Sequence, residues 1–216
     1  ISTREMNIPP EMTAMWNSRY AANEYAYGMA PNQFLKTVLE QYDKGGDILF
    51  PAEGEGRNAV YAATQKWNVT AFDISTEGQK KALKLATGQQ VKIDYEVGDF
   101  MELELRNKKF DAAALIYAHF PTHLISLYHQ KIAEMIKPMG LIILEGFSKG
   151  HLPLREENPA VGGPSSLDML FSLEGIQNDF SGFEIICLEE VEIQLSEGLY
   201  HNGAGKVIRF IGQKPK

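Results

Sequence analysis

Short apolar runs alternate with amphipathic stretches along most of this 216-residue chain. The apolar runs have the length of strands and end at turn-forming residues; they span 47–51, 69–73, 92–97, 110–117 and 141–145. Apolar positions at helical spacing fill the intervals between them, at 58–67, 76–87 and 121–137. Strands that alternate with helices predict a doubly wound α/β fold, with a mostly parallel sheet covered on both faces.

Residues that favour helix ends support these boundaries. Ser75 is a good N-cap for the helix that follows it, and Pro121 suits the first turn of the next one. The segment 138–140 holds a proline and a glycine and is expected to end that helix. The segment 149–166 is rich in proline and glycine, so we interpret it as a loop.

The two ends of the chain differ from this alternating pattern. A short helix over 167–178 precedes two long apolar runs, 183–194 and 205–213, which predict an antiparallel hairpin at the end of the sheet. The first 45 residues have a helical pattern, and we expect residues 1–45 to form a cap over the edge of the sheet where ligands bind. No repeat or linker interrupts the chain, so a single domain over 1–216 is predicted.

Charge and cysteine content narrow the functional classes. The net charge is −7 and no long run of Lys and Arg occurs, which argues against a nucleic-acid partner. Cys187 is the only cysteine, so we expect neither a disulfide within the chain nor a metal centre built on cysteine. No stretch approaches the roughly 20 apolar residues of a membrane span, and no apolar signal core opens the sequence. A cytoplasmic protein without a membrane partner, plausibly a monomer, is the expectation.

The turn after the first strand is the strongest candidate for chemistry. Gly54-x-Gly56-x-x-Ala59 joins a strand to a helix, and Asp73 ends the following strand. Glycines let a ligand approach the backbone closely, and the start of the helix offers free N–H groups. A carboxylate at the end of the second strand can accept from both hydroxyls of a ribose. This context predicts a cofactor that contains an adenine nucleoside.

Two cofactor classes fit that pattern, and charge favours one of them. An NAD(P)-dependent oxidoreductase would place a pyrophosphate at the loop, where Glu53 and Glu55 would repel it. S-adenosylmethionine (SAM) carries a sulfonium and an ammonium instead, which suit an acidic loop. Asp99 and Phe100, at the end of the third strand, can accept from an adenine amino group and stack on its ring. The alternative is that Asp99 caps a helix and Phe100 packs in the core.

The same segments resemble a known family. Residues 48–75, with Glu55-Gly56-Arg57-Asn58-Ala59-Val60, resemble the first two cofactor motifs of class I SAM-dependent methyltransferases. Within that class the chain is most similar to the tellurite-resistance and thiopurine methyltransferase-like branch. That likeness also covers Trp16-Asn17-Ser18-Arg19-Tyr20, Tyr25-Ala26-Tyr27-Gly28, Pro31-Asn32, Gly98-Asp99-Phe100, Lys137-Pro138-Met139-Gly140 and Tyr200-His201-Asn202-Gly203.

The resemblance implies a seven-stranded sheet and a set of cofactor-binding residues. Glycine-loop, ribose and adenine contacts would come from Glu53, Gly54, Gly56, Asp73, Ile74, Asp99 and Phe100, with Tyr117 at the end of strand four. Trp16, Arg19 and Tyr27 would close over the methionine end, where Arg19 would pair with the carboxylate. The family usually has an acid at Phe50, a glycine at Ala52 and a cysteine at Glu53. Glu53 is expected to take over the role of the missing acid by holding the ammonium.

The methyl acceptor is less well defined by the sequence. The segment after strand four lacks the Asn/Asp-Pro-Pro-Tyr motif of many N-methyltransferases, so we expect a small-molecule acceptor, with a soft sulfur, selenium or tellurium nucleophile as one possibility. His119 and His123 are the candidate catalytic bases, with structural roles or a metal pair as alternatives. Tyr200 and His201 either line the acceptor pocket or form an exposed turn. A SAM-binding domain without catalysis is the remaining functional alternative.

Overall fold

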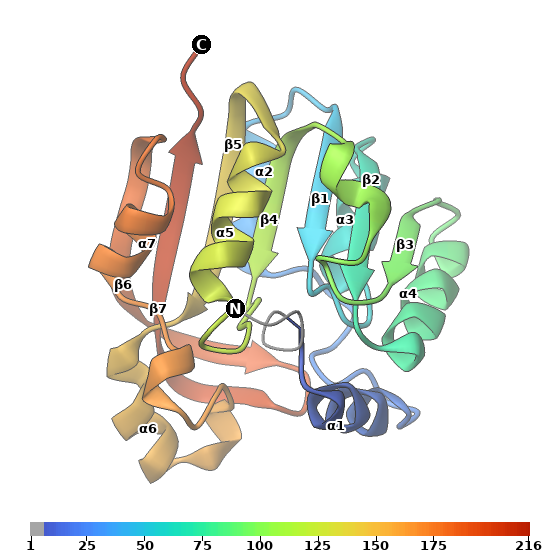
Figure 1. Ribbon diagram of the computed structural model, residues 1–216. Helices are drawn as coiled ribbons and strands as arrows, with labels where there is room; N and C mark the ends of the chain where they lie inside the picture. The colour runs from blue at the N-terminus through green and yellow to red at the C-terminus, as the bar shows by residue number, and fades with distance from the viewer. Residues whose placement is uncertain (1–6) are drawn as a thin grey trace.

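The computed structural model describes residues 7–216, apart from the side chain of Arg106, and it contains one sheet of seven strands in the order β3-β2-β1-β4-β5-β7-β6 (Figure 1). The strands are β1 (Asp47–Pro51), β2 (Asn68–Asp73), β3 (Asp94–Val97), β4 (Phe110–Ile116), β5 (Ile136–Phe147), β6 (Glu184–Glu197) and β7 (His201–Gln213). The first five pair in parallel, and β7 runs antiparallel to both β5 and β6. The predicted fold class, a mostly parallel sheet with an antiparallel hairpin at its end, is confirmed.

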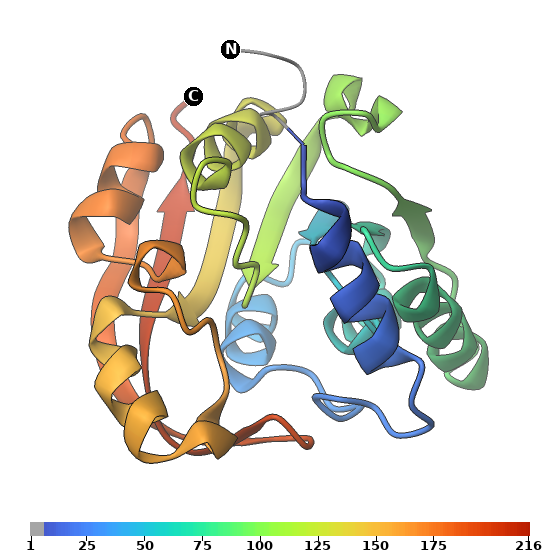
Figure 2. The same ribbon diagram turned by 60° about the horizontal axis from the view of Figure 1, so that its bottom comes forward.

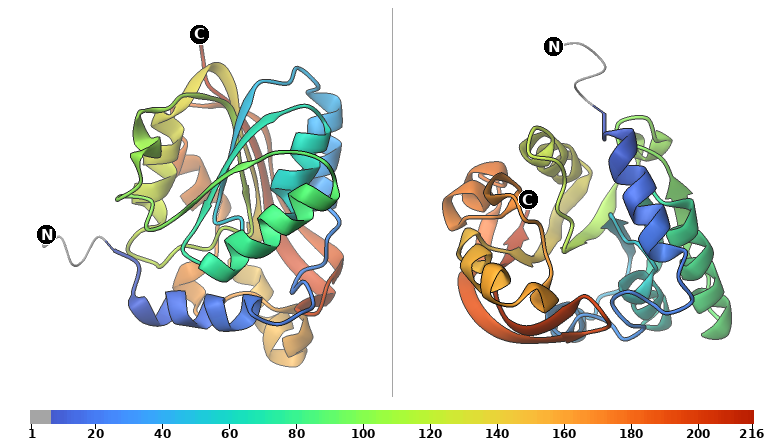
Figure 3. Two further views of the ribbon diagram at one scale, coloured as in Figure 1. Left: turned by 90° about the vertical axis from the view of Figure 1, so that its right-hand side faces the viewer. Right: turned by 90° about the horizontal axis from the view of Figure 1, so that it is seen from below.

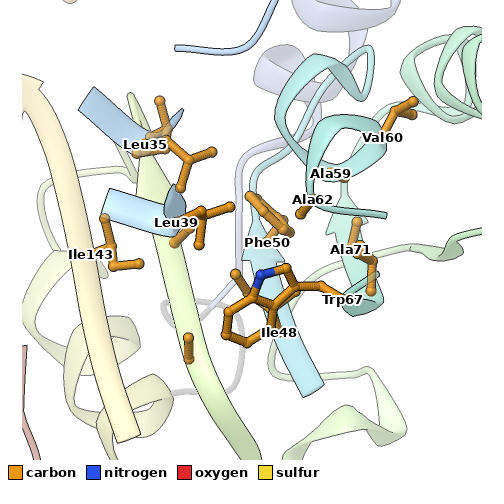
Figure 4. Close-up of a cluster of buried hydrophobic side chains, with 14 of the residues drawn as sticks. Leu35, Leu39, Ile48, Phe50, Ala59, Val60, Ala62, Trp67, Ala71 and Ile143 are labelled. Atoms are coloured by element: carbon orange, nitrogen blue, oxygen red, sulfur yellow. The ribbon is translucent and has the colours of Figure 1, made fainter. Parts of the chain in front are cut away.

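Helices cover both faces of this sheet. They are α1 (Pro10–Tyr20), α2 (Gln33–Gln41), α3 (Arg57–Thr64), α4 (Thr76–Gly88), α5 (Ile125–Glu134), α6 (Leu152–Glu157) and α7 (Leu173–Asp179). Side chains of α2, α3 and α4 share one buried cluster with the sheet, part of which Figure 4 shows. Side chains of α5 and α7 share the second cluster on the opposite face. Each face of the sheet therefore has its own hydrophobic core.

Strand β1 shows why the sheet lies between two helical layers. Ile48 and Phe50 point into the first cluster and Leu49 into the second, and all three are fully buried. Successive side chains of a strand point to opposite faces, so a continuous apolar run needs cover on both. Burying a side chain of this size contributes about 2 kcal/mol relative to exposure. None of the helices among residues 7–216 has the length and apolar character needed to cross a bilayer.

The N-terminal helices do not form one cap, as residues 1–45 were predicted to do. Helix α1 lies across the edge of the sheet where the parallel strands end (Figures 1 and 2). There Asn17 Oδ1 accepts a 2.6 Å hydrogen bond from Ser75 Oγ at the start of α4. Helix α2 instead packs on a face of the sheet, because Leu35 and Leu39 are core residues. Residues 1–6 of the predicted cap lie outside the described residues.

Several predicted boundaries move by a few residues. Ser75 is the N-cap of α4, as predicted, and accepts from the Gly78 N–H at 3.0 Å. Helix α5 begins at Ile125 rather than Pro121. The segment 138–140 lies within β5, where Met139 has a φ of 68° and the pairing with β4 shifts register. The predicted loop 149–166 contains α6 and two short 3-10 helices, so it forms a compact unit beside the carboxyl edge.

Candidate active site

A cavity of about 390 Å³ opens at the carboxyl edge of the sheet. Its walls come from the ends of β1, β2, β4 and β5, from α1 on one side, and from α6 with the segment that follows it on the other. Figure 2 and the right-hand view of Figure 3 show α1 and α6 on opposite sides of this edge. The crevice beyond the carboxyl ends of parallel strands is where doubly wound sheets bind ligands.

The glycine loop joins β1 to α3 along one wall. Gly54 and Gly56 have φ values of 60° and 88°, in the left-handed region that glycine adopts without strain. A Cβ on Gly56 would lie 2.5 Å from the Ala82 side chain, so only glycine lets α3 pack this closely against α4. Ala52 also has a positive φ, of 50°, which explains why a glycine is usual at that position in the family that the sequence resembles.

Asp73 holds the glycine loop from the end of β2. Its Oδ2 accepts a 2.8 Å hydrogen bond from the Gly54 N–H, and its Oδ1 accepts a 3.0 Å bond from the Ser75 N–H. Burial raises the pKa of Asp73 to about 6, although these backbone donors oppose the rise. Asp73 and its neighbour Ile74 both line the cavity, as predicted for residues that would contact a ribose and an adenine.

Glu53 occupies the start of α3. Its Oε1 accepts from the backbone N–H groups of Asn58 and Ala59, at 3.0 and 2.7 Å. These are donors that a phosphate at the start of the helix would need. No donor to Oε2 occurs among the side chains and backbone that the structure describes, and Glu53 lines the cavity. Burial raises its pKa to about 8.

Glu55 forms an ion pair within the fold, so its charge is not directed at a ligand. Its carboxylate accepts from Lys81 Nζ at 2.6 Å and from the Ala26 N–H at 2.7 Å. The neighbouring Lys81 neutralises Glu55, and the contact with Ala26 fixes the segment before α2 to the glycine loop. The argument that an acidic loop repels a pyrophosphate therefore rests on Glu53 and not on both glutamates.

Arg19 of α1 faces the cavity as an uncompensated cation. Its Nη1 donates to Tyr27 Oη at 3.0 Å, and its guanidinium lies over the rings of Trp16 and Tyr200, at 5.0 and 4.3 Å from their centroids. Within residues 7–216, no carboxylate forms an ion pair with it. Trp16, Arg19 and Tyr27 line the cavity together, so the structure brings together the three residues predicted for the methionine end.

Asp99 and Phe100 take the alternative roles that the sequence allowed. Asp99 does not line the cavity; its carboxylate accepts from the N–H groups of Ile8 and Met101 and from the Tyr128 hydroxyl. Phe100 touches the cavity wall but is fully buried, with its ring stacked on Phe72 at 5.0 Å. Both side chains thus have partners within the fold, and direct contact of this pair with adenine stays a prediction.

Tyr117 ends β4 and lines the cavity, as predicted. Its φ of 53° is unusual for a bulky residue, and its hydroxyl donates to Glu145 Oε2 at 2.9 Å. Glu145, only 1% exposed, also accepts from Arg209 Nε at 2.7 Å and from Asn32 Nδ2 at 2.6 Å. This network ties three distant parts of the chain to the cavity wall.

The predicted catalytic histidines do not have the geometry of a base. His119 lines the cavity, but its Nε2 accepts from the Phe147 N–H and its Nδ1 donates to the Met169 carbonyl, both at 3.0 Å. Burial lowers its pKa to about 4, so the ring is neutral. His123 is exposed and does not line the cavity. No cluster of three or more His, Cys, Asp or Glu within the described residues is arranged to hold a metal ion.

His201 is the histidine of the site that sequence reasoning left undecided. It is 4% exposed, lines the cavity and lies 4.8 Å from Tyr117, ring to ring. Its Nδ1 is 3.7 Å from Glu197 Oε1, and Glu197 also pairs with Arg57. Burial lowers the pKa of His201; for Glu197 burial acts in the opposite direction, but His201 and Arg57 outweigh it and hold that pKa at about 2. Because β7 is antiparallel, its first residue lies at the ligand edge, which the strand pattern could have indicated.

One known family matches the part of the chain that contains the glycine loop. Residues 48–140, which contain the glycine loop, Asp73 and Tyr117, match the family described as a methyltransferase domain. No curated protein matches the chain.

Solved structures share the fold at low identity. A protein studied for the conversion of a disulfide bond into a thioacetal group during echinomycin biosynthesis superposes with a TM-score of 0.74, at 16% identity over 94% of this chain and 92% of its own. A SAM-dependent methyltransferase from Anabaena variabilis gives 0.69, at 18% identity over 94% and 93%. Magnesium protoporphyrin IX methyltransferase from Synechocystis, with bound S-adenosylhomocysteine, gives 0.61, at 15% identity over 99% and 88%.

The fold and the family match point in the same direction. The sheet order, the glycine loop and the cavity at the carboxyl edge are those of a Rossmann-like methyltransferase fold. The match over 48–140 is to a methyltransferase domain, and the solved structures share the fold of this chain.

Proposed function

We propose that this protein transfers the methyl group of SAM to a small-molecule acceptor. One observation carries the proposal: the cavity combines the Glu53 and Asp73 carboxylates with the uncompensated Arg19 guanidinium. A ligand with one cationic end, a ribose diol and one carboxylate complements that arrangement, and a pyrophosphate does not. The charges of these residues fit SAM.

Each residue of the cofactor end has a distinct role in the proposal. Asp73 accepts from the ribose hydroxyls, and Ile74 lies beside the adenine. Glu53 Oε2 receives the ammonium, since Oε1 is committed to α3. Arg19 pairs with the carboxylate, and Trp16 and Tyr27 close over it from the same side.

The chemistry requires little of the protein beyond positioning. SAM supplies a methyl group already activated on a sulfonium, so the protein gains most by aligning the acceptor with it. We propose a soft sulfur, selenium or tellurium nucleophile, as in the tellurite-resistance and thiopurine methyltransferase-like branch that the sequence resembles. The similar protein studied for the conversion of a disulfide bond into a thioacetal group is in keeping with an acceptor that contains sulfur.

An acceptor that carries a proton would lose it to His201 rather than to His119 or His123. The neutral ring of His201 can take a proton, and the Glu197 carboxylate 3.7 Å from its Nδ1 stabilises the imidazolium that forms. Tyr117 beside it would orient the acceptor.

Calorimetry with SAM, S-adenosylhomocysteine and NAD tests the cofactor. We expect both sulfur nucleosides to bind and NAD not to bind; binding of NAD alone would support the oxidoreductase alternative instead. Turnover over a panel of thiols, selenite, tellurite and small amines then tests catalysis. Binding of SAM without turnover of any acceptor would favour the non-catalytic SAM-binding domain.

The proposal extends to partners and location. We propose that the protein acts in the cytoplasm on a dissolved acceptor, without a nucleic-acid or membrane partner; the net charge of −7 supports the absence of a nucleic-acid partner, and the oligomeric state stays open, with a monomer as one possibility. Size-exclusion chromatography with light scattering tests the oligomeric state.

A further inference from the structure

Charged side chains divide the cavity into two parts. Carboxylates gather at the glycine-loop end, where Glu53 follows β1 and Asp73 ends β2. The other end is built by α6 and the segment after it, and among the described lining residues it contributes Arg155 and no carboxylate. The cofactor end therefore attracts cations and the α6 end attracts anions.

Arg155 is held in place by the backbone and has no acidic partner. Its Nε donates to the Gly163 carbonyl at 2.9 Å, and Gly163 also lines the cavity. Within residues 7–216, no carboxylate lies within ion-pair distance of Arg155, although the exposed Glu156 and Glu157 follow it in sequence. The hydrogen bond to Gly163 orients the guanidinium and leaves its two terminal NH₂ groups available to a ligand.

The other two arginines of the cavity have roles of their own. Arg57 forms an ion pair with Glu197, which compensates its charge. Arg19 lies on α1, bonded to Tyr27, at the end proposed for the methionine carboxylate. Among the arginines that line the cavity in the described residues, Arg155 therefore has neither an acidic partner within the protein nor a role in binding the proposed cofactor.

The surroundings of Arg155 would strengthen its attraction for an anion. Phe147, Pro164 and Met169 contribute apolar surface to the same cavity, and the exposed Ser165 and Ser166, which also line it, add hydroxyl donors. A charge pair beside apolar walls is less screened than one in bulk water. The planar guanidinium matches a carboxylate or a similar planar oxyanion in two parallel hydrogen bonds.

We propose that the methyl acceptor carries an anionic group, a carboxylate or a similar oxyanion, that binds Arg155, while its nucleophilic atom lies toward Tyr117 and His201. This inference rests on the proposed function, because it takes the α6 end of the cavity as the acceptor site. Arg155 then selects the acceptor by charge, and the aromatic wall contacts its apolar part.

Binding of matched small probes tests the inference without knowledge of the natural acceptor. The protein is saturated with S-adenosylhomocysteine, so that Arg19 is occupied, and is titrated calorimetrically with benzoate, benzamide, 3-phenylpropanoate and 3-phenylpropanamide. We expect each carboxylate to bind at least about tenfold more tightly than its amide. Arg155→Gln should abolish this preference, and Arg155→Lys should keep part of it.

Controls separate charge selection from other effects. Lys149→Gln removes an exposed positive charge close to α6 in sequence and should leave the preference unchanged. Equal affinity for carboxylate and amide in the unmodified protein, no binding of either, or a preference that survives Arg155→Gln would overturn the inference. A preference lost only in Arg19→Gln would place the anion at the cofactor end and would also overturn it.

Binding of S-adenosylhomocysteine is measured separately, and it tests the proposed function rather than the role of Arg155. If S-adenosylhomocysteine does not bind, the proposed function fails. The comparison of carboxylate with amide on the ligand-free protein, with and without Arg155→Gln, would then decide whether Arg155 selects anions at all.

Discussion

Glu53 Oε1 accepts a 2.7 Å hydrogen bond from the backbone N–H of Ala59, so a carboxylate from the cavity wall caps α3. The glycine-loop helix of a dinucleotide site leaves those N–H groups free for phosphate. Here a carboxyl group of the protein itself occupies those donors, and it becomes an anion as the pH rises through about 8. One side chain therefore takes the N–H donors that a pyrophosphate would use and leaves its second oxygen for a cation.

The raised pKa of Glu53 predicts that cofactor binding depends on pH. Burial holds the pKa near 8, so below pH 8 the carboxyl must release a proton before it attracts an ammonium. The affinity for S-adenosylhomocysteine, whose ammonium keeps its proton in this range, should rise with pH by at most about tenfold per unit between pH 6.5 and 8, and level off above.

Glu53→Gln is the matched test of that dependence. The amide oxygen can still accept from Asn58 and Ala59, so the cap is kept while the charge is lost. Calorimetric titrations over the same range should show weaker binding with a flat pH profile. A slope that persists in Glu53→Gln would assign the proton to another group.

Asp73 should matter for binding more than other carboxylates on the sheet. Asp73→Ala removes the predicted ribose acceptor together with the partner of the Gly54 N–H. We expect SAM affinity to fall by about 2 kcal/mol or more, roughly thirtyfold. The exposed Asp94 at the start of β3 provides the control, and Asp94→Ala should bind as the unmodified protein does. Equal affinity in Asp73→Ala would mean that the ribose lies elsewhere.

The fold, and the position of the glycine loop and Asp73 at the cavity, could be predicted because their signals are local. A continuous apolar run such as 110–117 specifies a buried strand, and Gly56 with Asp73 lie at fixed places after two such strands. Helix α2 was misplaced because residues 33–41 have the same helical pattern whether they cover an edge or a face. Only the tertiary position of Leu35 decides between the two.

The acceptor end could not be predicted, because its residues come together from distant parts of the chain. His119 follows β4 and so has the position of a base, yet a backbone N–H from β5 and a carbonyl from residue 169 occupy its ring. His201 reaches the same edge through an antiparallel strand. Arg155 lies in a proline- and glycine-rich segment that gave no functional signal. Sequence patterns indicate the secondary structure of a segment. The roles of these residues depend instead on their contacts with distant parts of the chain.

His119 should prove structural when it is replaced. His119→Leu leaves the Phe147 N–H and the Met169 carbonyl without their partner, which should cost about 1–3 kcal/mol of unfolding free energy. Urea denaturation measures the loss, and the exposed His123→Ala should change stability by less than about 0.5 kcal/mol. If the folded His119→Leu protein lost the acidic limb of its pH–rate profile, His119 would be a base after all.

The buried carboxylate of Glu145 should make Arg209 essential for stability. Arg209→Met leaves Glu145, 1% exposed, with only the neutral donors Asn32 and Tyr117, and we expect a loss of about 3 kcal/mol. The double variant Glu145→Gln with Arg209→Met should recover much of this loss, because no buried charge remains.

The Lys206–Glu190 pair, whose side chains are both 32% exposed, is the control for Arg209→Met. Lys206→Met should cost less than about 1 kcal/mol, as exposed ion pairs do. Chemical denaturation gives the unfolding free energies of the unmodified protein, Arg209→Met, Lys206→Met and the double variant. These values compare the contributions of the two ion pairs. Equal losses for Arg209→Met and Lys206→Met would contradict a buried charge network. A loss confined to Arg209→Met, with weaker binding of SAM, would show that the network holds Tyr117 and the segment around Asn32 in the positions that the cavity needs.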